Sequence, residues 1–168
     1  MDTLAAVGLG LEPPEPHLLD KKPRNRKAPL ISKPMWWMIL GMGLYTFVVL
    51  MVLFQWNFLG AGARYSAEHL SVIFTTFVFL QVFNEINARS IDPKRSPFEG
   101  ILKSKGFLLI GVVIVVVQVL LTQFGGKLFQ TVPLSPVTWA KVIGFSSTAL
   151  IAGGIVRAVM RAFDVKEA

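Results

Sequence analysis

Long runs without Asp, Glu, Lys or Arg constrain this chain more than any other feature of its sequence. Residues 35–63 and 106–126 contain none of these charged residues and consist mostly of aliphatic and aromatic side chains. A membrane-spanning helix needs about 20 such residues, because each adds about 1.5 Å and the hydrocarbon layer is about 30 Å thick. Both runs are therefore predicted to cross a membrane.

Two further runs carry few charges. Residues 68–88 include Glu68 at one end and Glu85 near the other, and residues 137–156 include only Lys141, whose long side chain can reach the interface.

The chain opens with a short apolar run, residues 3–11, that covers about 14 Å, half a crossing. From its length alone this run is either half of a membrane helix or a frayed helix with Asp2 as its N-cap.

We therefore expect an all-α, polytopic membrane helix bundle with four full transmembrane helices and an N-terminal half-helix. The expected segments are a partial helix (residues 1–11), a cytoplasmic loop (12–34), four transmembrane helices (35–59, 68–88, 106–126 and 137–158) and a cytoplasmic tail (159–168). The composition agrees, because 53% hydrophobic and 16% charged residues is not the balance of a soluble domain.

The positions of the basic residues predict the orientation in the lipid bilayer. Most of the 17 Lys and Arg residues lie before the first full helix, in the connection after the second, and at the chain's end. Cytoplasmic segments of membrane proteins are enriched in Lys and Arg, so both termini are predicted to be cytoplasmic. The formal net charge of +7 therefore comes mainly from Lys and Arg residues on the predicted cytoplasmic side of the membrane. We expect no nucleic-acid partner.

Polar side chains within apolar helices are costly, so they are the first candidates for function. In the second full helix, Gln81, Asn84 and Ala88 share one face, while Glu85 and Asn87 flank it. Their oxygens suit a hard cation such as Ca²⁺, but for Asn84 and Asn87 interhelical hydrogen bonding is the favoured role. His17 and His69 lack a second metal ligand at helical spacing and are predicted to be exposed or interfacial.

Several strings resemble one family, the P-type calcium pumps of the plasma-membrane and vacuolar type. FNEINAR (residues 83–89) closely resembles the end of the eighth membrane helix in those pumps. The other matching strings follow in family order and cover nearly the whole chain: MDTLAAVGLGLEPP (1–14), RNRKAPLIS (24–32), FEGI (98–101) and QFGGK (123–127). The resemblance implies that the chain runs from the end of the sixth membrane helix through the tenth.

The resemblance also implies an ion site. Asp2 takes the position of an aspartate that binds the transported Ca²⁺ with an asparagine four residues earlier, a position that lies before Met1. Gln81 takes the position of a glutamate that completes a second Ca²⁺ site in reticulum-type pumps, so it is a possible neighbour of the ion. A neutral Gln there fits one ion per cycle, because losing a carboxylate weakens a Ca²⁺ site.

The family's catalytic parts have no counterpart in this sequence. The Asp-Lys-Thr-Gly phosphorylation motif is absent, so no residue is predicted to be catalytic and the chain alone is expected to be inactive as an ATPase. ATP and Mg²⁺ would act only through the missing catalytic half, the expected protein partner. We therefore expect the C-terminal membrane segment of a Ca²⁺-transporting P-type ATPase, as a fragment or a split subunit.

Two other functions fit the residues. One is an independent four-helix membrane protein that binds or regulates a complete transporter. The other is a channel, for which only four polar side chains are available to line a path: Gln81, Asn84, Asn87 and Gln118.

Overall fold

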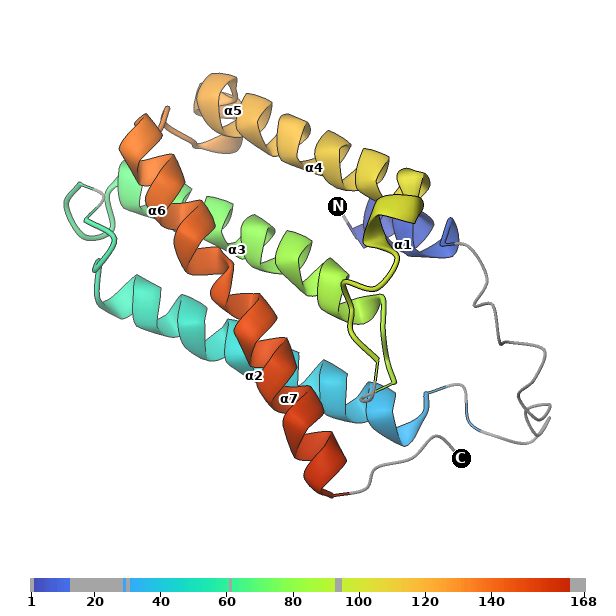
Figure 1. Ribbon diagram of the computed structural model, residues 1–168. Coiled ribbons are helices and arrows are strands. Elements are labelled where there is room, and N and C mark those ends of the chain that lie inside the picture. The colour runs from blue at the N-terminus through green and yellow to red at the C-terminus, as the bar shows by residue number, and fades with distance from the viewer. Residues whose placement is uncertain (1, 13–28, 30, 61, 93–94, 164–168) are drawn as a thin grey trace.

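The computed structural model describes residues 2–12, 29, 31–60, 62–92 and 95–163, and throughout these ranges the regular structure is helical (Figure 1). The expected all-α fold is confirmed. The helices are α1 (Asp2–Gly10), α2 (Lys33–Gln55), α3 (Ala67–Ala88), the 3-10 turn η2 (Ile101–Lys103), α4 (Lys105–Phe124), α5 (Gly126–Phe129), α6 (Pro136–Ser146) and α7 (Thr148–Ala162). In the described ranges α2, α3, α4 and the combined α6–α7 are long and apolar enough to cross a membrane, which confirms the expected number of such helices.

Serine caps fix where three of these helices begin. The side chain of Ser32 accepts a hydrogen bond from the backbone N–H of Met35, and Ser66 does the same for His69. Ser135 caps α6 by accepting from Thr138, and Pro136 follows it at the first helical position. Such caps replace the hydrogen bonds that the first backbone N–H groups of a helix lack.

Helix α3 is the centre of the bundle. It packs against α2, α4, α6 and α7, and it is the most buried of the four spans. Figure 1 shows α3 lying between α2 and α4, with α6 and α7 crossing α3 and α2. One apolar cluster joins α3 to α2 and α6 through Leu53, Phe79 and Val142, and a second joins it to α2 and α7 through Leu80 and Ala152.

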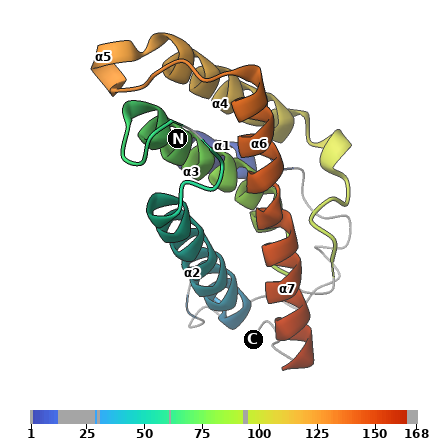
Figure 2. The same cartoon turned by 90° about the vertical axis from the view of Figure 1, so that its left-hand side faces the viewer.

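The last membrane span is bent where one straight helix was expected. Helix α6 ends at Ser146 and α7 begins at Thr148, and Figure 2 shows the change of direction between them. The hydroxyl of Ser147 donates to the carbonyl of Gly144, and that of Thr148 to Phe145. Hydroxyl groups that bond the preceding turn compete with the backbone ladder and bend helices, which accounts for the interruption.

Helix α1 is a short segment held against α4. Ideal Cβ atoms placed on Gly8 and Gly106 would lie 3.4 Å from Ile110 and 3.0 Å from Leu11, respectively. Each glycine therefore allows the facing helix to approach closely. In the described residues α1 makes its main packing contacts with α4.

Candidate functional site

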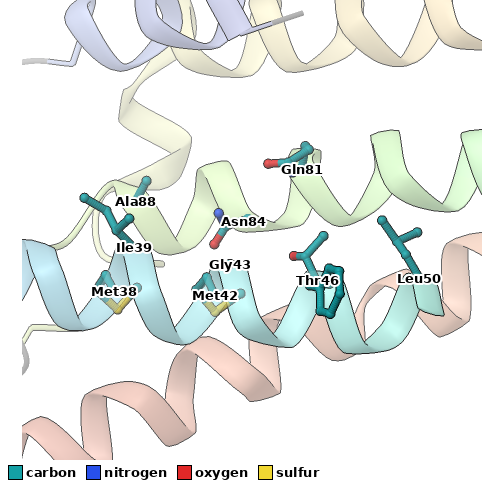
Figure 3. Close-up of a pocket in the computed structure, with 10 residues that line it drawn as sticks. Met38, Ile39, Met42, Gly43, Thr46, Leu50, Gln81, Asn84 and Ala88 are labelled. Atoms are coloured by element: carbon teal, nitrogen blue, oxygen red, sulfur yellow. The ribbon is translucent and has the colours of Figure 1, made fainter. Parts of the chain in front are cut away.

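A groove of about 510 Å³ lies between α2 and α3. Figure 3 shows its lining, which is mostly apolar on the α2 side and carries two carboxamide side chains on the α3 side. These are Gln81 and Asn84, and Ala88 continues the same face. The expectation that these three residues share one face is confirmed.

The carboxamides of Gln81 and Asn84 make no hydrogen bond to any residue that the structure describes. Both side chains are half-buried, and Asn84 points from α3 toward Gly43 of α2 in Figure 3. Beside Gly43 there is open space, since a Cβ placed there would meet nothing within 4 Å. An unsatisfied amide at membrane depth costs free energy, so this groove is suited to a partner that offers polar groups.

Asn87 has a different role from its neighbours. Its side chain is fully buried, donates to the backbone carbonyl of Ala149 (2.9 Å) and accepts from the Nη2 atom of Arg157 (3.0 Å). Asn87 therefore joins α3 to α7, and interhelical hydrogen bonding is the role that the structure gives it. Gln118 is also buried and donates to Thr122 on its own helix. These two side chains are thus separated from the groove, and the four polar residues do not line a common path.

Asp2, the residue expected to bind the transported ion, is the first residue of α1. Its side chain lies outside the described part of the structure. Helix α1 lies against α4, whereas the groove containing Gln81 lies between α2 and α3. In the residues described, no cluster of three or more His, Asp or Glu side chains is placed to hold a metal ion.

His69 is completely buried, contrary to the expectation of an exposed or interfacial side chain. Its Nδ1 atom accepts from the backbone N–H of Tyr65 (3.0 Å), and its Nε2 atom lies 3.0 Å from the carbonyl oxygen of Leu53. Accepting at Nδ1 leaves the proton on Nε2, so the neutral ring joins the end of α2 to the start of α3. His17 and the basic residues of 21–27 lie outside the described residues.

Arg89, just after α3, binds three separate segments. Its guanidinium donates to both carboxylate oxygens of Glu12 (2.5 and 3.0 Å) and to the backbone carbonyl of Pro97 (2.7 Å). It also lies over the Phe107 ring, 5.2 Å from the ring centre. The hydrogen bonds from Arg89 hold the pKa of the Glu12 carboxyl below its ordinary value of 4.5. Sequence reasoning missed this pair, because residues 77 positions apart give no local signal.

Comparison with known proteins shows which family this chain is related to. The family described as "Cation transporting ATPase, C-terminus" matches residues 1–159. The chain belongs to this family. It is 38% identical over 173 residues to plasma membrane calcium-transporting ATPase 1 of Homo sapiens, an alignment that covers 95% of the chain. It is also 37% identical over 164 residues to calcium-transporting ATPase 2 of Schizosaccharomyces pombe, across 97% of the chain.

A third relative, plasma membrane calcium-transporting ATPase mca-1 of Caenorhabditis elegans, is 36% identical over 170 residues. The chain spans only 13–14% of the length of these calcium-transporting relatives. It corresponds to their C-terminal, multi-pass membrane region, which confirms the family resemblance. The groove, the half-helix and the Arg89 contacts thus lie in a chain that corresponds to one part of much longer relatives.

Proposed function

We propose that the chain is the C-terminal membrane segment of a Ca²⁺-transporting P-type ATPase and packs against that pump's catalytic part. The observation that carries this proposal is the groove between α2 and α3, where Gln81 and Asn84 have no hydrogen-bond partner among the described residues. A membrane helix of the catalytic part, bearing polar side chains, would fill the groove and satisfy both carboxamides.

In this proposal Asp2 is a ligand of the transported Ca²⁺. A carboxylate is the preferred ligand type for this ion, and the N-terminal end of the short helix α1 would face the membrane helices of the catalytic part. Gln81 is a possible neighbour of the ion through its amide oxygen, in addition to its contact with the incoming helix. ATP and Mg²⁺ would act in the catalytic part, and the coupling between hydrolysis and transport would pass through the contacts between the two parts.

We further propose that the connection between α3 and α4, together with both termini, lies on the cytoplasmic side. The connection between α2 and α3, which includes Arg64, and the short helix α5 would then face the opposite side. The distribution of Lys and Arg supports this orientation.

The proposal is tested by supplying the catalytic part separately. The chain is co-expressed with the N-terminal part of a full-length calcium-transporting relative that ends before the matched region. We expect Ca²⁺-stimulated ATP hydrolysis and vesicular Ca²⁺ uptake only when both parts are present. Asp2→Asn should abolish Ca²⁺ activation, while the matched change Asp92→Asn, in the loop after α3, should preserve it.

The groove is tested in the same system. Gln81→Leu with Asn84→Leu should reduce co-purification of the two parts at least several-fold, because an apolar groove offers the incoming polar groups no partner. Leu120→Ala, on the exposed face of α4, serves as the control. If no activity is recovered and the chain instead co-purifies with a complete pump, the independent binding protein becomes the better description.

A further inference from the structure

The contact between Glu12 and Arg89 joins the end of α1 to the end of α3. Both oxygens of the Glu12 carboxylate accept from the Arg89 guanidinium, and the side chains are only 23% and 6% exposed, respectively. In a bidentate ion pair of this kind, the two parallel hydrogen bonds fix the relative orientation of the guanidinium and the carboxylate in addition to their electrostatic attraction. This distinguishes the pair from Arg95–Glu99 on the neighbouring loop, where the side chains are 31% and 61% exposed.

Arg89 is itself held in place, so it is a fixed anchor for Glu12. Its Nη1 atom donates to the carbonyl of Pro97, its Nη2 atom lies 3.5 Å from the carbonyl of Glu99, and its guanidinium covers the Phe107 ring. The guanidinium is therefore bound to the loop before α4 and to the first turn of α4. Glu12 supplies the connection to α1.

In the part of the chain that the structure describes, helix α1 packs mainly against α4. Its packing against α4 depends on close approach at Gly8 and Gly106, where the helices meet through glycine and aliphatic side chains. Aliphatic contacts of this kind contain no directional hydrogen bonds, so they oppose sliding of α1 along α4 less specifically than an ion pair does. The ion pair lies two residues after the helix and opposes such sliding through its directional hydrogen bonds.

We propose that the Glu12–Arg89 pair is a positioning contact that sets the place of α1 along α4, and with it the depth of Asp2 in the membrane. The importance of Asp2 rests on the proposed function, whereas the position of α1 does not. Neither Glu12 nor Arg89 contacts the transported ion. Their effect on transport passes through the backbone of α1, in which Asp2 is the first residue.

The absence of cysteine makes the position of α1 directly measurable. Spin labels are attached to Leu4→Cys on α1 and Leu128→Cys beyond the end of α4, both of which are exposed positions. The distance between the labels is measured by pulsed electron paramagnetic resonance on the whole chain in lipid vesicles. We expect Glu12→Gln to broaden the distribution or shift its mean by up to about one helical turn, about 5 Å.

Two variants decide whether the ion pair causes this shift. Glu99→Gln removes the neighbouring exposed pair by the same chemical change and should leave the distribution unaltered. Glu12→Asp keeps the carboxylate and leaves the contacts of Arg89 with Pro97 and Phe107 in place, so it should give a distribution closer to that of the parent chain than Glu12→Gln does. An unchanged distribution in Glu12→Gln would overturn the proposal, and so would a change in Glu12→Asp as large as that in Glu12→Gln.

The transport consequence is measured in the two-part pump. Glu12→Gln should raise the Ca²⁺ concentration for half-maximal activation several-fold with a smaller change in maximal rate, because the ligand is displaced rather than removed. Equal Ca²⁺ activation in Glu12→Gln and the parent would overturn the link to Asp2. If the two-part pump has no activity at all, the distance measurement still decides the positioning role of the pair.

Discussion

Asn87 shows how much a single buried amide can determine in a membrane bundle. It contacts α7 through two hydrogen bonds, and the helix approaches it closely because position 153 has no side chain. An ideal Cβ on Gly153 would lie 2.3 Å from the Cγ atom of Asn87. The contact between α3 and α7 therefore depends on a glycine and an asparagine together.

The Gly153→Ala substitution should destabilise the chain by about 1–3 kcal/mol, because the added methyl group must displace Asn87 or separate the helices. The measurement is unfolding in mixed micelles, followed by circular dichroism or tryptophan fluorescence. The next residue provides the control, since a Cβ on Gly154 would meet nothing within 4 Å. Gly154→Ala should leave stability unchanged or raise it by up to about 1 kcal/mol, because alanine favours a helix more than glycine does. Equal losses in both variants would contradict this explanation.

The sequence correctly predicted which side chains share a helix face where helical periodicity alone determines it. Gln81, Asn84 and Ala88 were predicted to share a face because residues three and four apart do so on any helix. His69 was predicted wrongly, because its burial depends on the end of α2 lying beside the start of α3. Local spacing does not contain that information.

At the scale of helices, α2 and α7 are joined by a polar contact. The hydroxyl groups of Tyr45 and Thr148 lie 2.6 Å apart, close to the bend between α6 and α7. Further along the same two helices, a Cβ on Gly41 would approach Val156 to 2.7 Å. A hydrogen bond at the bend and the close approach of Gly41 to Val156 thus align α7 with α2.

The coupling between Tyr45 and Thr148 is measurable by a double-mutant cycle. Tyr45→Phe and Thr148→Val each remove one hydroxyl and preserve most of the shape. We expect an interaction free energy of about 0.6 kcal/mol, with about 1.7 kcal/mol as the upper end for such bonds in membranes. The four unfolding free energies are measured in the same micelles, and strictly additive effects would show that the two hydroxyls do not interact.

The number of spans was predictable because length and hydrophobicity alone determine whether a helix can cross a bilayer. The bend at Ser147 could not be predicted from the sequence. Serine and threonine also occur in straight membrane helices, and they bend a helix only when their hydroxyl groups hydrogen-bond to the preceding turn. Their spacing of four residues predicts that Gly144, Thr148 and Ala152 form one small-residue seam on the last helix, and two of the three lie at helix contacts. Thr148 and Ala152 lie in the contacts with α2 and α3, but Gly144 is exposed beside open space.

For the whole molecule, the proposed orientation gives a direct labelling experiment. Single cysteines at Lys103, in the turn before α4, and at Arg64, between α2 and α3, are introduced into the cysteine-free chain. In right-side-out membrane vesicles a maleimide that cannot cross the membrane should label Arg64→Cys and leave Lys103→Cys unlabelled until the vesicles are opened. The reverse pattern would contradict the proposed orientation, and the parent chain controls for unspecific labelling.

Acid should weaken the attachment of α1 in a way that depends on Glu12. The folded pKa of Glu12 lies below its ordinary value of 4.5, so its stabilising contribution is complete above that pH and is lost as the pH falls through the lowered folded pKa. We therefore expect stability differences between the parent and Glu12→Gln to be constant at neutral pH and to vanish in strong acid. Unfolding measured between about pH 3 and pH 7 tests this. A difference that fails to shrink as the pH falls below 4.5 would contradict it.

The central position of α3 has a consequence for how the chain is made. The amide of Asn87 finds its partners, Ala149 and Arg157, on the last helix, and Ser146 on α6 donates to the backbone of α3 at Thr76. During synthesis α3 therefore enters the bilayer well before the residues that satisfy its polar groups have left the ribosome. Loss of the final helix would leave these polar groups exposed to lipid. Cellular quality control recognises incompletely folded membrane proteins by exposed polar groups of this kind.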